Sequence, residues 1–337
     1  MIWSKLKEPP WRTIVPGCGF LILLFVAFSI WSPGKDIRDG RHDLGQNGIW
    51  LGHGWLGGDE WFTKHNKTDQ ITRFRELSNI QALANNLRLH RITDVFPHLC
   101  PATIEGELPP VDADQVERFL DVLSEFRVMP WIGGVNGENA LYENARWRSN
   151  FVSNVRKLFQ QHPRFAGVQI NVEPLTNGDE AFLAFLDQLR TAIPPGKILS
   201  IAAYPPPTRW HPYPEVHWDE PYFREVAKRT DQLAVMMYDT SLRVPKLYQK
   251  LMADWTREVL AWSEGRPVLL GVPTYDDGDA EYHHPEVENL RNALLGIHRG
   301  LSRKELPSNY QGVVIYCEWE TDETEWKEFR NQFLKSP

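Results

Sequence analysis

The segment at residues 167–175 reads Gly-Val-Gln-Ile-Asn-Val-Glu-Pro-Leu. Successive side chains of a β-strand point to opposite faces, so the aliphatic residues at positions 168, 170 and 172 share one face. Gln169, Asn171 and Glu173 share the other face, where polar groups require hydrogen-bond partners if they are buried. The segment therefore predicts a strand with one apolar face against helices and one polar face toward an interior.

Similar strand-like segments recur on both sides of this one, with amphipathic helical patterns between them. Because strands that alternate with helices form parallel sheets, eight such units predict a (β/α)8 TIM barrel. An open doubly wound sheet is the alternative, although no Gly-x-Gly-x-x-Gly follows the first strand. Residues 177–180 resemble a capping box that starts a helix. The other strand segments are 48–55, 92–100, 128–136, 198–206, 232–240, 268–276 and 312–320.

The N-terminal residues have a different character. Residues 13–31 contain no charged side chain, and their number is close to the ~20 residues that cross a bilayer. Lys5, Lys7 and Arg12 precede them, which favours a cytoplasmic N-terminus in the cell membrane and an extracytoplasmic barrel. A cleaved signal peptide is the alternative. We expect a cytoplasmic N-terminus (1–12), a transmembrane signal anchor (13–31), a linker (32–47) and a barrel domain (48–337).

Composition excludes several classes of protein. The net charge of −7 argues against a nucleic-acid partner, which requires a basic surface. Three cysteines, one of them inside the apolar run, allow at most a disulfide between Cys100 and Cys317. No metal or cofactor is expected, because the first strand carries His53 without the His-x-His of metal-dependent barrels. Fourteen tryptophans and ten tyrosines are typical of proteins that stack sugar rings.

Polar and aromatic residues gather at the carboxyl ends of the predicted strands. Active sites of TIM barrels are built at these ends, so we expect the residues to share one cleft. His283 and His284, in contrast, fall in a predicted loop and are expected to be solvated. The candidates are His53, Trp55, His98, Trp131, Gln169, Asn171, Glu173, Tyr204, Tyr238, Asp239, Tyr275, Tyr316, Glu318 and Trp319.

The order of these segments resembles glycoside hydrolase family 18, the chitinase-like barrels. The family's fourth strand reads Asp-Gly-x-Asp-x-Asp-x-Glu, and residues 166–173 here read Ala-Gly-Val-Gln-Ile-Asn-Val-Glu. Its Met-x-Tyr-Asp is matched at residues 236–239, and its Gly-x-Pro-x-Tyr at residues 271–275. On the eighth strand Tyr316 stands where the family usually has a tryptophan, and Trp319 follows.

The resemblance implies roles for four residues. Glu173 matches the general acid, and Tyr238 matches the hydroxyl that holds the substrate's acetamido group, whose oxygen attacks the sugar. Asn171 replaces the aspartate that steadies the cationic ring, and Gln169 replaces the aspartate that would share its proton. Three outcomes follow: a weak or altered hydrolase, an enzyme with another second carboxylate, or a binding protein that retains the cleft.

Glu318 is one candidate for another carboxylate, because a two-carboxylate glycosidase needs its pair ~5–9 Å apart. Asp276 and Asp277 are further candidates at the seventh strand, and pairing of Glu318 with an arginine is the structural alternative. We expect a glycosidase-like enzyme that acts on a cell-envelope or extracellular glycan, and glycans with N-acetylated sugars are among the candidate substrates. Trp55, Trp131, Tyr316 and Trp319 would offer stacking faces. The alternative is a noncatalytic carbohydrate-binding or scaffold barrel.

Overall fold

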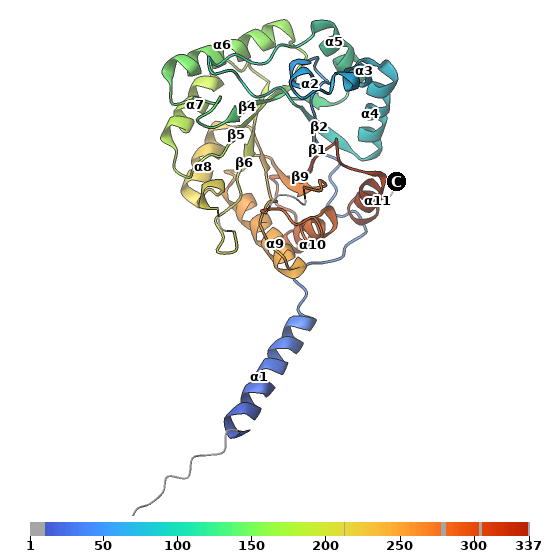
Figure 1. Cartoon of the computed structure of the whole chain (residues 1–337), viewed down its shortest axis with the longest axis vertical. Coiled ribbons are helices and arrows are strands. Elements are labelled where there is room, and N and C mark those ends of the chain that lie inside the picture. The colour runs from blue at the N-terminus through green and yellow to red at the C-terminus, as the bar shows by residue number, and fades with distance from the viewer. Residues whose placement is uncertain (1–10, 212, 278–280, 303–304, 336–337) are drawn as a thin grey trace, which may run out of the picture. The chain divides into compact units, whose positions relative to one another are not determined.

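The computed structural model describes residues 11–211, 213–277, 281–302 and 305–335 (Figure 1). The chain divides between Pro33 and Gly34 into two units. The first contains helix α1 (Trp11–Ile30). Within the described residues, no helix combines the length and the apolar character that are needed to span a bilayer, so the predicted transmembrane segment is not supported.

The second unit is built on a single sheet of parallel strands that curls round, consistent with a TIM-like barrel (Figure 1). The strand order is β3-β2-β1-β9-β8-β7-β6-β5-β4, and each of the eight predicted strand segments overlaps a strand. The strands are β1 (Asn47–Leu51), β2 (Ile92–Pro97), β3 (Arg127–Val128), β4 (Trp131–Val135), β5 (Gly167–Glu173), β6 (Ile198–Ala203), β7 (Gln232–Val235), β8 (Val268–Pro273) and β9 (Tyr310–Tyr316).

The two ends of this strand order are held together. β3 and β4 are separated by only two residues of chain, and both lie next to the β2 segment. The amide of Leu99, just after β2, donates to the carbonyl of Trp131 at 3.0 Å, and the amide of Met129 donates to that of Val95 at 2.9 Å. The bond from Leu99 joins the end of β2, the second strand of the order, to β4, the last strand, so the sheet closes on itself as a barrel requires.

Helices follow the strands and cover the outside of the sheet (Figure 1). In the helix after β4, the buried residues include Phe151, Val155, Leu158 and Phe159, whose spacing places them on one face, as expected for an amphipathic helix. The helical segments are α2 (Glu60–Lys64), η1 (Thr68–Gln70), α3 (Ile71–Arg75), α4 (Leu77–Leu89), α5 (Ala113–Val122), α6 (Ala145–Gln161), α7 (Glu180–Arg190), η2 (Pro214–Val216), α8 (Glu220–Arg229), α9 (Pro245–Trp262), α10 (Leu290–Gly300) and α11 (Glu323–Gln332).

The predicted linker is packed against the barrel over much of its length. Ile37, His42 and Asp43 are buried. The carboxylate of Asp43 accepts from Arg91 at 3.0 Å and from the amide of Lys335 at 3.0 Å. Because these contacts satisfy a buried charge, residues 34–46 form part of the barrel unit and not a free polar tether.

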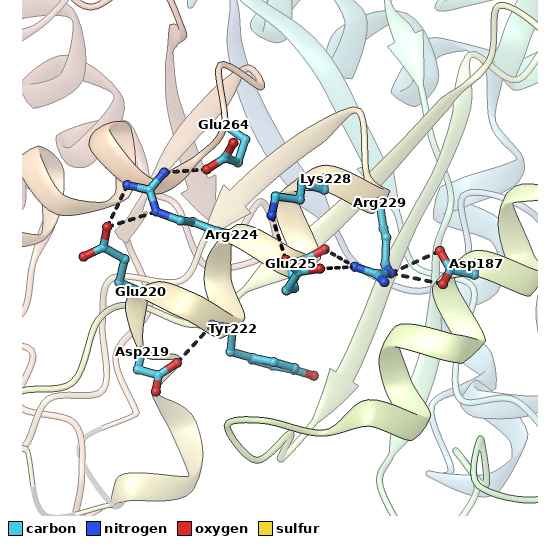
Figure 2. Close-up of polar contacts among 9 residues, drawn as sticks. All are labelled: Asp187, Asp219, Glu220, Tyr222, Arg224, Glu225, Lys228, Arg229 and Glu264. Atoms are coloured by element: carbon cyan, nitrogen blue, oxygen red, sulfur yellow. Dashed lines mark hydrogen bonds and ion pairs between the residues drawn. The ribbon is translucent and has the colours of Figure 1, made fainter.

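Helix α8 is tied to both neighbouring segments by ion pairs (Figure 2). Arg224 reaches Glu264, just after the end of α9, and Arg229 reaches Asp187 on α7. Asp219 caps the helix by accepting from the amide three residues further on at 3.0 Å. Exposed pairs of this kind contribute only up to about 1 kcal/mol each. Their effect is to fix the end of the loop that runs from β6 to α8.

The start of α7 provides a test of the local energetics. Asp179 is its N-cap, accepting from the amide of Phe182 at 2.9 Å and from the hydroxyl of Tyr142 at 2.6 Å. Asp179→Ala leaves both donors unpaired and should lower the free energy of unfolding by about 1–2 kcal/mol. Asp179→Asn retains an N-cap acceptor and should lose clearly less. Urea unfolding curves compare the two variants, and equal losses would contradict the capping role.

Candidate active site

Glu173 lies in the middle of a cleft at the carboxyl ends of the strands. Three pockets share lining residues there, so they form one continuous depression. The central pocket shares Glu173, Tyr238 and Asp239 with one neighbour, and Trp131 and Tyr316 with the other. The structure thus brings candidates from β4, β5, β9 and the segment after β7 together, as the barrel prediction requires. The central pocket is lined by Trp50, Trp131, Asn171, Glu173, Ala202, Met236, Tyr238, Asp239 and Tyr316.

Glu173 is the last residue of β5, and its side chain reaches solvent in the cleft. Desolvation by the surrounding barrel wall nevertheless raises the pKa of its carboxyl, and the charge of Asp239 raises it further. The amide Nδ2 of Asn171 donates to Glu173 Oε1 at 2.7 Å, which favours the ionised form and opposes the shift. The net result is a carboxyl that holds its proton to a higher pH than an ordinary glutamate.

Gln169, two positions before Asn171, is part of the hydrogen-bonded interior of the barrel. It is fully buried, and its Oε1 accepts from Trp50 Nε1 at 2.6 Å across the barrel. Its Nε2 donates to Ser200 Oγ at 3.2 Å. The predicted polar face of β5 therefore has two parts. Gln169 forms hydrogen bonds inside the barrel, whereas Asn171 and Glu173 line the cleft.

An aromatic wall borders the central pocket. The rings of Tyr238 and Tyr316 stack with centroids 5.2 Å apart at an interplanar angle of 16°. Trp319 meets Tyr316 edge-on at 5.5 Å, and 42% of its surface is exposed. Trp131 lines the same pocket from β4 but is almost buried. The accessible rings of Tyr316 and Trp319 offer flat apolar surface of the kind that stacks against a sugar ring, whereas Trp131 is buried.

Asp239 is the second carboxylate of the central pocket, and the protein holds it firmly. Its backbone has a positive φ of 60°, unusual for a residue other than glycine. Its Oδ1 accepts from the hydroxyl of Tyr275 and lies 3.1 Å from His283 Nδ1. His283 is fully buried, so the prediction that it is solvated is wrong. The local chain brings His283 back over Tyr275, whose carbonyl lies 3.2 Å from His283 Nε2.

This network predicts a pH dependence of stability. Burial raises the pKa of Glu288 to about 7, and its Oε2 accepts from the amide of Thr240 at 2.8 Å. Burial lowers the pKa of His283, but the hydrogen bond and charge of Asp239 outweigh it and leave that pKa raised. Both groups bind protons more tightly when folded, so their contribution to stability falls as the pH rises toward and through 7. Glu288→Gln should flatten the dependence of the urea midpoint on pH between 5 and 8. An unchanged slope in the variant would contradict the assignment.

Two predicted residues lie away from Glu173. Trp55 is only 2% exposed and packs edge-on against Phe74 with centroids 5.0 Å apart, so it belongs to the core and offers no stacking face. Its Nε1 donates to Glu318 Oε2 at 3.5 Å. Glu318 lines the adjoining pocket with Trp319 and does not line the pockets that contain Glu173. Asp239, and not Glu318, is therefore the carboxylate that lines the same pockets as Glu173.

The remaining carboxylates and the cysteines can be placed in the same way. Asp276 and Asp277, the candidates after β8, are both exposed, and neither lines the pockets around Glu173. Tyr204, in contrast, does line one of those pockets. Cys100 and Cys317 are free thiols, so the disulfide that their number allowed is not formed.

His53 and His98 form the outer end of the cleft. His53 stacks on Trp61 with centroids 4.3 Å apart, and the His98 ring lies 3.6 Å from that of His53. Burial lowers the pKa of both histidines, so they are neutral near pH 7. Cys100 Sγ lies 3.1 Å from His98 Nε2. Over the described ranges, no three His, Cys, Asp or Glu side chains gather in a way that would hold a metal ion.

Several residues of the cleft escaped prediction. Trp50 lines the central pocket although it lies in the middle of β1, and its same-face neighbours at positions 48 and 52 are glycines. Alternation along that strand could have identified it. His211 and His217 enter the cleft from a proline-rich loop, where periodicity carries no signal.

Comparisons with known proteins support the fold. No family model and no curated protein sequence matches the chain. Among solved structures, the Bacillus cereus spore cortex-lytic enzyme SleL is similar with a TM-score of 0.55 and 12% identity, over 86% of this chain and 76% of that one. A chitinase from Chromobacterium violaceum is similar with a TM-score of 0.55 and 16% identity, over 85% of this chain and 98% of that one.

A third similar structure is GH5_18 from Streptomyces cattleya in complex with GlcNAc, with a TM-score of 0.54 and 16% identity, over 86% of this chain and 74% of that one. The similar structures are thus chitinase-like and related glycoside hydrolases. At these identities the likeness establishes the curled parallel barrel, and function has to be argued from the site.

Proposed function

We propose that the protein is a glycoside hydrolase that acts on an extracytoplasmic glycan with N-acetylated sugars, and that Glu173 is its general acid. The observation that carries the proposal is Glu173 itself. It stands at the end of β5 in an aromatic-walled cleft, and desolvation raises its pKa. A general acid must hold its proton near the working pH and release it to the leaving oxygen, and a raised pKa serves this purpose.

The polar groups of the central pocket suit a sugar ligand. The indole Nε1 of Trp131 and the Oδ1 of Asn171 are buried and have no hydrogen-bond partner in the described part of the chain. Buried polar groups normally find partners, so a ligand with both donors and acceptors fits this pocket. An acetamido group supplies an N–H that can donate to Asn171 Oδ1 and a carbonyl oxygen that can accept from a donor such as Trp131 Nε1.

Roles for the neighbouring residues follow from this arrangement. Asn171 orients the acetamido group through Oδ1 while its Nδ2 contacts Glu173. Tyr238 positions the acetamido oxygen for attack on the sugar, and Asp239 supplies negative charge beside the cationic transition state. Tyr316 and Trp319 provide stacking faces.

A noncatalytic carbohydrate-binding function is the second candidate, and one contact favours it. The Asn171 Nδ2 bond stabilises the ionised form of Glu173, whereas the aspartate of the family would disfavour that form. Asn171 is neutral and cannot supply charge to the transition state.

A substrate screen separates the two candidates. The full-length protein is incubated with β-linked N-acetylglucosamine oligomers and with peptidoglycan fragments, and products are followed by mass spectrometry. We expect new reducing ends from at least one of these substrates. Binding without any cleavage would favour the noncatalytic candidate, and neither binding nor cleavage would contradict both.

The extracytoplasmic location remains a prediction from the basic residues that precede the apolar N-terminal run. It is tested by fractionation of cells that produce the full-length chain, combined with protease treatment of intact cells. Recovery of the barrel inside a protease-protected cytoplasmic fraction would contradict it.

A further inference from the structure

A buried histidine lies behind the Asp239 carboxylate. His283 is fully buried and lines none of the three pockets of the cleft. Its ring stacks on that of Tyr275 with centroids 4.1 Å apart at an interplanar angle of 22°. The amide of Ser241 donates to the carbonyl of Tyr282 at 2.9 Å. This bond joins the chain just after Asp239 to the chain just before His283, so the two side chains are held next to each other.

The two partners of His283 determine how many protons its ring carries. Nε2 lies 3.2 Å from the carbonyl oxygen of Tyr275, and Nδ1 lies 3.1 Å from Asp239 Oδ1. A carbonyl oxygen and a carboxylate oxygen both only accept, so each ring nitrogen has to donate. A neutral imidazole has one N–H, whereas an imidazolium has two. The geometry therefore matches the charged form of His283, with a proton on both nitrogens.

The charged groups that face His283 favour the same form. Burial alone would lower the pKa of His283, but the hydrogen bond and charge of Asp239 and the charge of Glu288 raise it. Burial raises the pKa of the Tyr248 hydroxyl on α9 and of the Tyr275 hydroxyl, so both hydroxyls keep their protons near pH 7. The adjoining titratable side chains along the chain are those of Tyr282 and His284.

Asp239 connects this histidine to the reacting part of the cleft. It lines the same two pockets as Glu173, and its charge adds to the desolvation that raises the pKa of Glu173. Its backbone has a positive φ of 60°, a conformation that persists only where the surroundings hold it. A group that fixes the Asp239 carboxylate therefore also fixes the charge that acts on Glu173.

We propose that His283 is an imidazolium that acts as a positioning residue, because it donates to Asp239 Oδ1 and holds that carboxylate beside Glu173. A ring that loses a proton retains one N–H and has to give up one of its two hydrogen bonds, together with its attraction for the carboxylate. The catalytic consequence rests on the proposed function, whereas the ion pair does not require a glycan. Turnover should then fall with rising pH for a second reason besides the ionisation of Glu173.

The first part of the test observes the ring directly and needs no substrate. The full-length protein is labelled with 15N-histidine, and long-range proton–nitrogen correlation spectra are recorded between pH 5 and 9. The signal that disappears in His283→Gln identifies His283. We expect two protonated ring nitrogens at pH 7. A neutral ring at that pH, with the shared proton on Asp239, would overturn the proposal.

A pair of carboxylate variants tests the partner. Asp239→Asn should lower the pH at which His283 loses its proton by about one unit or more, because an opposite charge at this distance favours the imidazolium. Asp276→Asn removes an exposed carboxyl that does not line the pockets around Glu173, and should leave the titration of His283 unchanged. A titration that is equally unaffected by both variants would also overturn the proposal.

The second part separates positioning from packing. His283→Phe retains an aromatic ring against Tyr275 but has no donor, whereas His283→Gln retains a donor for Asp239 but has no ring. Cleavage of the β-linked N-acetylglucosamine trimer is measured for both. We expect His283→Phe to lose on the order of tenfold in kcat with little change in KM, and His283→Gln to lose clearly less. A role in packing alone would give the reverse order.

The outcomes distinguish this inference from the hydrolase proposal. An imidazolium in a protein that cleaves no glycan would retain the ion pair and refute the hydrolase. A neutral His283 in a protein that cleaves a glycan would retain the hydrolase and refute the inference. Turnover by His283→Phe that equals or exceeds that of His283→Gln would refute the positioning role, whatever the charge of the ring.

Discussion

Glu173→Gln should reduce glycan turnover on the order of 100-fold or more and leave ligand binding largely unchanged. The amide has nearly the shape of the carboxyl but carries no acidic proton for the leaving oxygen. Contact with Asn171 can persist, because an amide oxygen accepts the Nδ2 bond that Glu173 Oε1 accepts at 2.7 Å. Initial rates on the best substrate of the screen and calorimetric affinities for the same oligomer measure the two effects.

The pH dependence of the wild type and a matched variant complete this experiment. Since Glu173 acts in its protonated form, turnover should fall as the pH rises through its raised pKa. Asp276→Asn removes an exposed carboxyl that does not line the pockets around Glu173, and should leave turnover unchanged. Turnover by Glu173→Gln at the wild-type rate would show that another group is the acid.

Asn171→Asp should raise turnover of N-acetylated substrates by roughly tenfold, which is about 1.4 kcal/mol in the barrier. The new carboxylate lies next to Glu173 and raises its pKa, because two neighbouring carboxylates resist full ionisation. It also places negative charge beside the cationic transition state, which the neutral amide cannot do. The measurement is kcat/KM on an N-acetylated oligomer at several pH values.

The control for this variant is Asn171→Ala, which removes the amide and adds no charge. It should lower turnover, because the substrate loses the Oδ1 acceptor that has no partner in the described part of the chain. An Asn171→Asp variant that is no more active than Asn171→Ala would contradict the substrate-assisted route.

The fold could be predicted because its signals are local. Alternation within 167–173 and the spacing of apolar residues in α6 each depend on neighbours along the chain. Strand ends could also be placed, and with them Glu173, Asn171 and Tyr238, because a parallel barrel brings all strand ends to one side.

Contacts between residues distant in sequence could not be predicted in the same way. His283 lies 44 residues from Asp239, and no periodicity relates the two. The burial of His283 depends on how the chain folds back after β8. For the same reason, the contacts that hold the Asp239 carboxylate could not be predicted from the sequence. Likewise, the sequence could not show whether Glu318 or Asp239 shares a pocket with Glu173. That distinction depends on where the side chains lie.

Two segments could not be placed from composition alone, residues 34–46 and the loop that contains His211 and His217. Residues 34–46 looked like a polar linker, but Asp43 is buried because Arg91 lies opposite it. His211 and His217 lie in a proline-rich loop for which no prediction could be made from the sequence, and both are buried. Burial of such groups follows from partners and cavities, which composition does not encode.

The most direct test of the central claim varies the leaving group. Glu173→Gln and the wild type are compared on the N-acetylglucosamine dimer and on the 2,4-dinitrophenyl glycoside of the same sugar. Dinitrophenolate leaves without a proton, whereas a sugar alcohol needs one. If Glu173 is the general acid, the variant loses on the order of 100-fold in kcat/KM on the dimer and less than about tenfold on the aryl glycoside. Equal losses on both substrates, or no loss on the dimer, would contradict it.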